Sequence, residues 1–312
     1  MTIKVCVVGL GYIGLPTATF IASKGFDVIG VDTNNEIIDK VNQGLSHFYE
    51  PDLDKLLQNV VNKGKLKASN EPQTSDVFII CVPTPLKSNG KTDNPEPDIS
   101  FIVNATEKIS TVLKSGDLII LESTSPVGTT ETVKELINEW RGRCDDLFFA
   151  HCPERVLPGQ ILKELTQNNR IVGGINTEDT KVAKNFYSKF VDGEILTTTA
   201  RVAEMSKLVE NSFRDVNIAF ANEISMLAED YEINPFELIK IANMHPRVNI
   251  LNPGVGVGGH CIAVDPWFLI SQKPNLTDLI RSGRNINISK SSWVIEMINK
   301  DVDSFFKENN RT

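Results

Sequence analysis

Three absences narrow what this chain can be. The sequence has no apolar run long enough to cross a bilayer. It has no run of Lys and Arg, and its net charge is −8, so a nucleic-acid partner is not expected. Its first segment, MTIKVCVVGLGYIG, is typical of a strand and its turn rather than of a secretory leader. We therefore expect a cytoplasmic protein whose partners are neither membranes nor nucleic acids.

Cysteine is scarce, and its spacing matches neither a disulfide framework nor a metal site. There are five cysteines, and no C-x-x-C or H-x-x-x-H spacing occurs. The pairs His151-Cys152 and His260-Cys261 are adjacent, and adjacent residues do not readily chelate one ion. We expect no metal, and free thiols in a reducing compartment. The cysteines are Cys6, Cys81, Cys144, Cys152 and Cys261.

The pattern of apolar residues predicts an α/β fold in the first part of the chain. Short apolar runs alternate with amphipathic stretches, which is typical of a parallel sheet wrapped by helices. The predicted strands are Ile3–Gly9, Asp27–Asp32, Val77–Val82, Asp117–Glu122, Leu147–His151 and Arg170–Gly173, with helices such as Leu15–Ser23, Ile99–Leu113 and Glu131–Trp140 between them.

From about Ala200 the pattern becomes helical. One long helix is predicted at Val202–Tyr231, a second at Pro235–Asn243 with Asn234 as its N-cap, and a last one from about Leu276 to Phe306. The polar segment Lys87–Asp98 is predicted to be a surface loop. We therefore predict a Rossmann-like nucleotide-binding domain at residues 1–198 and a mostly α-helical domain at residues 199–312.

The first apolar strand is followed by a G-x-G-x-x-G motif that opens a helix. The first glycine allows a tight turn, the second lets the backbone approach a pyrophosphate, and the third lets helix and strand pack closely. The helix N-terminus then faces the phosphates. The alternative is a glycine turn that binds nothing. The cofactor-binding candidates in this motif are Gly9, Gly11, Tyr12, Ile13 and Gly14.

Three further polar residues stand at predicted strand ends. Asp32 follows Gly14 by eighteen residues and can accept hydrogen bonds from ribose hydroxyls. It would repel a 2′-phosphate, so NAD is expected rather than NADP. Thr84 and Thr124 follow two other strands and are candidate cofactor contacts; for each, a hydroxyl that caps the next helix is an equal alternative.

A second group of residues carries reactive chemistry. Cys261 follows a glycine-rich loop and precedes Asp265 by four residues, so it is either an accessible nucleophile or a buried, inert thiol. Lys207, Asn211 and Arg214 share one face of the long helix. That stripe is either a solvated face, which its charges favour, or the lining of a cleft for an anionic ligand.

Together these pieces resemble the UDP-glucose/GDP-mannose dehydrogenase family across essentially the whole chain. The forms PERVLPG, HPRVNIL and GGHCIAVDPW are similar to the branch that oxidises UDP-N-acetyl-D-mannosamine. The matching segments are GLGYIGLPTA (Gly9–Ala18), CVPTP (Cys81–Pro85), ESTSPVGTT (Glu122–Thr130), CPERVLPG (Cys152–Gly159), NRIVGG (Asn169–Gly174), EMSKLVENSFRDVNIAFANE (Glu204–Glu223) and HPRVNILNPGVGVGGHCIAVDPW (His245–Trp267).

The resemblance implies an NAD-dependent, four-electron oxidation of a sugar 6-hydroxyl to a carboxylate. Cys261 would be the covalent nucleophile, Lys207 the general acid/base assisted by Asn211, and Asp265 and Glu154 would position or activate water. The resemblance also implies a homodimer through the helical domain. The substrate contacts it implies are Arg155, Val156, Lys207, Asn211, Arg214, His245, Arg247 and Gly258.

The chain also departs from the family pattern. Val264 and Pro158 stand where the UDP-glucose branch carries a lysine and an acidic residue, which argues against UDP-glucose as substrate. Complete members continue into a second nucleotide-type domain that grips the UDP, whereas this sequence stops at Thr312. We therefore expect a folded, NAD-binding chain with little dehydrogenase activity. Two alternatives stay open, namely a UDP-N-acetyl-D-glucosamine 6-dehydrogenase and a non-catalytic NAD-binding fragment.

Overall fold

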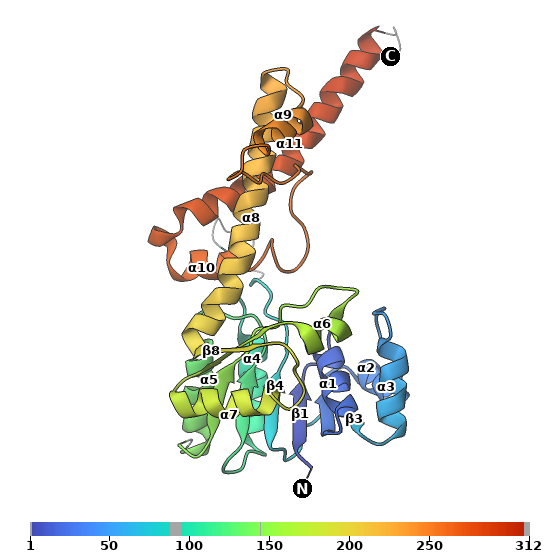
Figure 1. Ribbon diagram of the computed structural model, residues 1–312, viewed down its shortest axis with the longest axis vertical. Helices are drawn as coiled ribbons and strands as arrows, with labels where there is room; N and C mark the ends of the chain where they lie inside the picture. The colour runs from blue at the N-terminus through green and yellow to red at the C-terminus, as the bar shows by residue number, and fades with distance from the viewer. Residues whose placement is uncertain (1, 88–94, 144, 309–312) are drawn as a thin grey trace. The chain divides into compact units, whose positions relative to one another are not determined.

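A computed structural model describes residues 2–87, 95–143 and 145–308 (Figure 1). The chain divides into two compact units. The sheet unit comprises Met1–Pro85 and Pro97–Lys207, and the helical unit comprises Leu86–Glu96 and Leu208–Thr312. Residues 88–94 of the expected surface loop, and Cys144, lie outside the described residues.

Within the described part of the sheet unit, eight strands form one sheet in the order β3-β2-β1-β4-β5-β6-β7-β8. All neighbouring pairs are parallel except β6 and β7, which are antiparallel. Val7 on β1 is in register with Gly30 on β2 and Ile79 on β4. The strands are β1 (Lys4–Val8), β2 (Asp27–Val31), β3 (Leu66–Ser69), β4 (Val77–Ile80), β5 (Leu118–Leu121), β6 (Phe148–His151), β7 (Arg170–Gly174) and β8 (Ile195–Thr199).

The six strands that the sequence predicts are all present, and two more complete the sheet. The central strands β4 and β5 are buried on every residue, so they appear in the sequence as continuous apolar runs. The two additional strands, β3 and β8, lie at the edges of the sheet. Their sequences, LKAS and ILTTT, are partly exposed and polar, so their apolar signal is weak.

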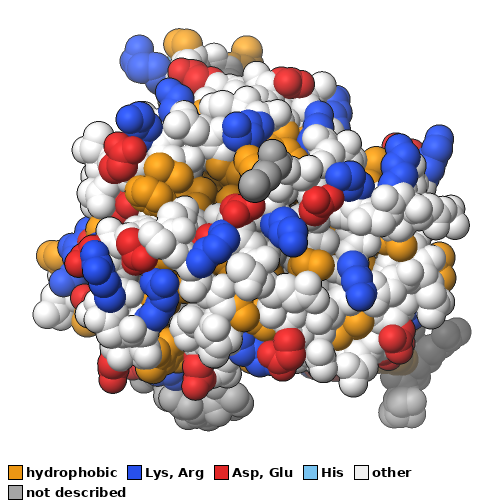
Figure 2. All heavy atoms as spheres, turned by 90° about the horizontal axis from the view of Figure 1, so that it is seen from below, with side chains coloured by type: hydrophobic (Ala, Val, Ile, Leu, Met, Phe, Trp, Pro, Cys, Tyr) orange, Lys and Arg blue, Asp and Glu red, His pale blue; other side chains and the backbone are white. Residues whose placement is uncertain are grey.

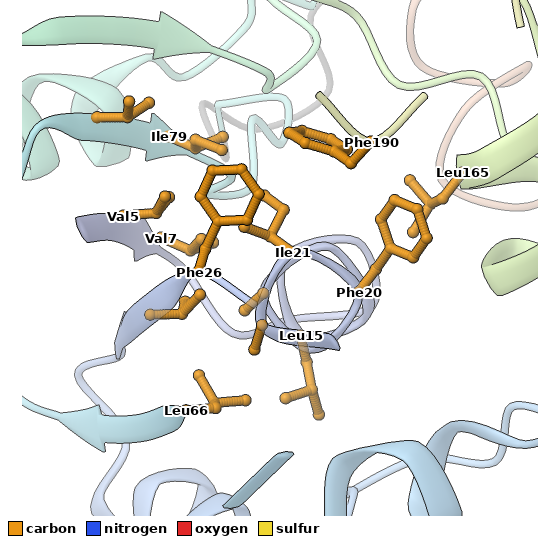
Figure 3. Close-up of a cluster of buried hydrophobic side chains, with 14 of the residues drawn as sticks. Val5, Val7, Leu15, Phe20, Ile21, Phe26, Leu66, Ile79, Leu165 and Phe190 are labelled. Atoms are coloured by element: carbon orange, nitrogen blue, oxygen red, sulfur yellow. The ribbon is translucent and has the colours of Figure 1, made fainter. Parts of the chain in front are cut away.

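Helices cover both faces of this sheet (Figure 1). One apolar cluster joins alternate strand residues to α1, α3 and α6; Figure 3 shows Leu15 and Ile21 of α1 among Val5, Val7 and Ile79 of the strands. A second cluster joins the opposite strand residues to α4 and α5. The helices are α1 (Gly14–Ser23), α2 (Asn35–Asn42), α3 (Leu53–Asn62), α4 (Ser100–Ser110), α5 (Thr129–Arg141), α6 (Ile161–Gln167) and α7 (Thr177–Tyr187).

The long helix α8 (Ala200–Asp230) starts in the sheet unit and continues into the helical unit. It is followed by α9 (Pro235–Ala242), α10 (Pro266–Gln272), a short 3-10 turn (Pro274–Leu276) and α11 (Asp278–Glu308). The predicted N-cap of α9 is confirmed, because the Asn234 side chain accepts from the backbone N–H of Phe236 and Glu237. The last helix begins at Asp278 rather than Leu276, because the 3-10 turn comes first.

Charges of both signs are interspersed on the face of the molecule that Figure 2 shows. Within the described ranges, no helix is both long and apolar enough to cross a membrane. The same residues contain no group of three or more His, Cys, Asp or Glu side chains that could hold a metal ion.

Candidate active site

The glycine motif forms the turn between β1 and α1. Gly9 has a φ of +94°, and its N–H donates to the Val31 carbonyl at 2.7 Å. A Cβ on Gly9 would lie 2.7 Å from the Cys81 carbonyl oxygen, and one on Gly14 would lie 1.8 Å from the Gly9 oxygen. A Cβ on Gly11 would meet nothing within 4 Å. The fold therefore requires Gly9 and Gly14, whereas the open space at Gly11 suits the close approach of a cofactor pyrophosphate.

Asp32 follows β2 and holds this turn in place. Its Oδ2 accepts from the Leu10 backbone N–H at 2.9 Å, and its Oδ1 accepts from the Asn34 N–H at 2.9 Å. Each carboxylate oxygen has a second lone pair, so the side chain can still accept from a ribose hydroxyl. Asp32 therefore fixes the turn as well as offering a ribose acceptor.

The two threonines at strand ends contact each other. The Thr84 hydroxyl donates to the Thr124 backbone carbonyl at 2.7 Å, and the Ser123 hydroxyl donates to the Val82 carbonyl at 2.7 Å. These bonds connect the segments that follow β4 and β5 at the carboxyl edge of the sheet. The Thr84 hydroxyl thus bonds a neighbouring loop rather than capping a helix.

Glu50 links the glycine turn to the CPERVLPG segment, and sequence reasoning missed it. The Tyr12 hydroxyl donates to Glu50 Oε2 at 3.1 Å, and the Gly159 and Ile161 N–H groups donate to the same carboxylate at 2.9 Å each. Burial, together with Glu50, raises the pKa of Tyr12. Glu50 itself is buried, but in the sequence it is one of several acids in a short polar stretch, so the sequence carries no signal for this contact.

Glu154 is held by a buried arginine. Arg170 Nη2 lies 2.8 Å from Glu154 Oε2; the Arg170 side chain is buried and that of Glu154 is only 10% exposed. The Arg155 backbone N–H donates to Glu154 Oε1 at 2.6 Å, and the Arg155 side chain donates to the Asn169 carbonyl at 2.6 Å. Val156 packs against the apolar core of the sheet unit. The pairing with Arg170 keeps the carboxylate oriented.

Glu122 is a second buried acid in this unit. Burial, reinforced by Glu154, raises its pKa to about 7, against lowering by Arg170 and Thr17. The Thr17 hydroxyl donates to Glu122 Oε1 at 3.1 Å.

Cys152 is also fully buried, which raises its thiol pKa to about 11. That thiol is therefore not a nucleophile at neutral pH.

The start of α8 is anchored to the N-terminus of α5. The buried Glu204 carboxylate accepts from the N–H of Gly128 at 2.6 Å and from the N–H and hydroxyl of Thr130 at 2.8 and 2.6 Å. One turn later, Lys207 is half-buried at the end of the sheet unit. Glu204 therefore fixes the part of α8 that carries Lys207.

The rest of the polar stripe lies in the helical unit. Asn211 is 4% exposed and Arg214 is exposed. Asn211 Nδ2 donates to Asp265 Oδ2 at 2.6 Å, and Asp265 is also buried, at the start of α10. The stripe is therefore not a uniformly solvated face, since its central residue holds a buried carboxylate.

Cys261 is exposed, unlike the buried Cys6 and Cys152. Its carbonyl accepts from the N–H of Val264 and Asp265, which places the thiol at the start of a turn that leads into α10. Gly258 is exposed, and a Cβ there would meet nothing within 4 Å.

Two further predicted substrate contacts lie in the segment after α9. His245 and Arg247 are exposed, and the Arg247 N–H donates to His245 Nδ1 at 3.4 Å.

A glycine turn on a mostly parallel sheet, with an acid after the second strand, defines a dinucleotide-binding fold. Residues 3–191 match the NAD binding domain, and residues 201–289 the central domain, of the UDP-glucose/GDP-mannose dehydrogenase family. The chain belongs to this family. The predictions of the family, of the α/β fold and of NAD as cofactor are thereby confirmed.

Individual relatives and a solved structure match nearly the whole of this chain. The chain is 53% identical to a UDP-N-acetyl-D-mannosamine dehydrogenase from Campylobacter jejuni, over 96% of this chain and 75% of that protein. It is 50% identical to an NDP-N-acetyl-D-galactosaminuronic acid dehydrogenase from Ralstonia nicotianae, over 97% and 73%. The solved structure of a UDP-D-ManNAc dehydrogenase from Pyrococcus horikoshii is similar with a TM-score of 0.91 at 44% identity, over 99% and 72%.

Proposed function

We propose that this chain carries the reacting groups for NAD-dependent oxidation of the 6-hydroxyl of UDP-N-acetyl-D-mannosamine to UDP-N-acetyl-D-mannosaminuronate. The observation that carries the proposal is the exposed Cys261 at the end of a glycine-rich loop, four residues before a carboxylate that Asn211 holds. The 53% identity to a relative of that name supports the choice of sugar.

The proposed reaction removes four electrons in two steps. NAD held on the glycine turn would supply the oxidising power, taking one hydride from C6 in each step, so two molecules would be reduced. The alcohol first loses a hydride and a proton to give the aldehyde. The Cys261 sulfur adds to the aldehyde carbon, and loss of a second hydride and proton converts the thiohemiacetal to a thioester. Water then cleaves the carbon–sulfur bond, which releases the carboxylate and restores the thiol.

The proposed roles of the other residues follow from their chemistry. Lys207 takes and returns the hydroxyl proton and stabilises the oxyanion, and Asn211 donates to the same oxygen or to Asp265. Asp265 and Glu154 orient water for hydrolysis of the thioester. Because the ion pair with Arg170 fixes the Glu154 carboxylate, we assign Glu154 an orienting role.

Binding roles are proposed for the remaining candidates. The cofactor would lie on the glycine turn, with the ribose at Asp32 and further contacts from Thr84 and Thr124. The sugar nucleotide would contact an exposed or half-exposed set that comprises Arg155, Val156, Arg214, His245, Arg247 and Gly258. The proposed reaction requires Cys261 in its reduced form, which suits a reducing compartment, so we propose a cytoplasmic location.

The test compares several UDP-sugars as substrates under the same assay conditions. NADH formation is measured with UDP-N-acetyl-D-mannosamine, its glucosamine and galactosamine counterparts, and UDP-glucose. The matched relatives are longer than the matched region, so the assay uses this chain and a chimera extended with the remaining segment of the Campylobacter jejuni relative. We expect the mannosamine sugar to be preferred and Cys261→Ser to abolish acid formation. Preference for the galactosamine sugar would favour the activity named for the Ralstonia relative.

We also propose a homodimer through α8. Apolar residues occur on several sides of this helix, and exposed ones include Phe213, Phe220 and Leu227. The neighbouring α9 exposes Phe236 and Ile241. An apolar surface of this kind is typical of a subunit interface. Light scattering at micromolar concentration tests the proposal, and a monomer there would refute it.

A further inference from the structure

A buried ion pair in the helical unit reaches the loop that carries Cys261. Arg284 on α11 is 2% exposed, and its Nε lies 2.8 Å from Oδ2 of the fully buried Asp215 on α8. Nη1 of Arg284 donates to the Ala263 carbonyl at 2.9 Å, two residues after Cys261. Burial raises the pKa of Asp215 even though Arg284 lowers it. A buried ion pair often adds little net stability, because both charges lose their hydration. We therefore infer a role in positioning the loop.

The loop that carries Cys261 comprises residues 254–265, and the same network also reaches Gly254 at its start. The Asn287 side chain donates to Asp215 Oδ1 at 2.8 Å and to the Asp215 carbonyl at 2.9 Å. Asn287 Oδ1 accepts from Asn222 Nδ2 at 2.8 Å, and Asn222 Oδ1 accepts from the Gly254 N–H at 2.8 Å. All four side chains are buried. Gly254 and Ala263 are thus connected through α8 and α11.

Contacts with the loop itself are concentrated near its start. The Ser291 hydroxyl donates to the Val255 carbonyl at 2.7 Å. Gly256 has a φ of +134°, and a Cβ there would lie 2.6 Å from Ser291 Oγ and 3.1 Å from the Asn287 carbonyl oxygen. At Gly258 and Gly259 a Cβ would meet nothing within 4 Å. The loop is therefore held near both ends and open just before Cys261.

We propose that Arg284, Asp215, Asn287 and Asn222 form a clamp that positions the Cys261 loop. The clamp residues are positioning residues, because their contacts are with the loop backbone and with one another. Their catalytic consequence rests on the proposed function of Cys261. Their effect on the conformation of the loop does not depend on that function, so the structural and the catalytic effect can be tested separately.

The test uses two variants that release one end of the loop each. Arg284→Lys keeps the positive charge near Asp215, but a single ammonium cannot reproduce the planar fork that spans Asp215 and Ala263. Asn222→Ala removes the acceptor for Gly254 and is the second variant should Arg284→Lys fail to fold. Lys290→Met is the matched control, because buried Lys290 on α11 donates to Ser225 on α8 at 2.9 Å and so joins the same two helices.

Hydrogen–deuterium exchange of the amides in residues 254–265 is the primary measurement. We expect at least ten-fold faster exchange there in Arg284→Lys and Asn222→Ala, with protection retained along α8 and α11. Lys290→Met should leave loop exchange unchanged. Loop exchange at the wild-type rate in both variants would overturn the clamp. So would a uniform rise along both helices, because it would show only that the network packs the helices together.

Enzyme kinetics in the chimera give the second readout. We expect kcat for sugar oxidation to fall at least ten-fold in the clamp variants, with the KM for NAD unchanged, since the sheet unit is untouched. An unchanged kcat with a loosened loop would refute the catalytic consequence. If the wild-type chimera oxidises no UDP-sugar, the proposed function fails, while the exchange data still decide whether the clamp exists.

Discussion

Asn211 on α8 and Asp265 at the start of α10 share a buried hydrogen bond of 2.6 Å, although they are 54 residues apart. The amide donates to the carboxylate, so the bond fixes the carboxylate without neutralising it. The bond thereby holds this carboxyl group in place four residues after Cys261.

Asn211→Asp should convert this bond into a repulsive pair. Two buried carboxylates at that distance raise the pKa of one of them, so the folded state holds an extra proton. The variant should therefore lose stability as pH rises through that raised pKa, by roughly 1–3 kcal/mol at pH 8. Urea unfolding at pH 5 and pH 8 measures the loss. Asn59→Asp, at an exposed position of α3, is the control, and an equal response in both variants would contradict the prediction.

Two glycines of the turn should behave differently. Gly14→Ala places a Cβ against the Gly9 carbonyl and should cost more than about 2 kcal/mol of stability. Gly11→Ala meets no protein atom, so stability should change by less than about 0.5 kcal/mol while NAD affinity falls about ten-fold or more. Thermal unfolding and calorimetric titration with NAD separate the two effects. Normal NAD binding by Gly11→Ala would mean that the pyrophosphate lies elsewhere.

Asp32 should make the chain prefer NAD to NADP. A 2′-phosphate would meet a carboxylate, so the difference in binding free energy should be at least about 1–2 kcal/mol. Asp32 also accepts from the Leu10 N–H, so Asp32→Ala should loosen the turn and weaken binding of both cofactors. Asp32→Asn keeps one acceptor oxygen, so it should weaken NAD binding less than Asp32→Ala does. Calorimetry gives all the dissociation constants, and equal values for NAD and NADP in the wild type would contradict the assignment.

Glu122 should give the sheet unit a pH-dependent stability. Its pKa is raised to about 7 in the folded chain from an ordinary 4.5. Between these values the folded state holds a proton that the unfolded state has released, so stability falls as pH rises from about 4.5 to 7 and then levels off. Glu122→Gln mimics the protonated form, so its stability relative to wild type should increase from pH 5 to pH 8 by roughly 1–3 kcal/mol. Glu135→Gln, at an exposed position of α5, should show no such trend, and a similar trend in both variants would argue against a buried, protonated Glu122.

The sequence by itself determined the features that depend on neighbours along the chain. The apolar runs of β4 and β5, the turn at Gly9 and the cap at Asn234 are local, because strand burial, a tight turn and an N-cap each involve residues a few positions apart. The family motifs were equally readable, since each is a short contiguous string. The weak signals were those of the edge strands β3 and β8, whose half-exposed residues blur the pattern.

Only the tertiary structure decided which charged residues are buried and what they hold. Glu50 accepts from Ile161 at a separation of 111 residues, and Arg284 meets Asp215 from another helix. Nothing in the local sequence distinguishes these side chains from solvated ones, because charged residues are ordinarily exposed. A charge becomes buried when distant segments pack over it and supply its partners, and that packing exists only in the folded chain.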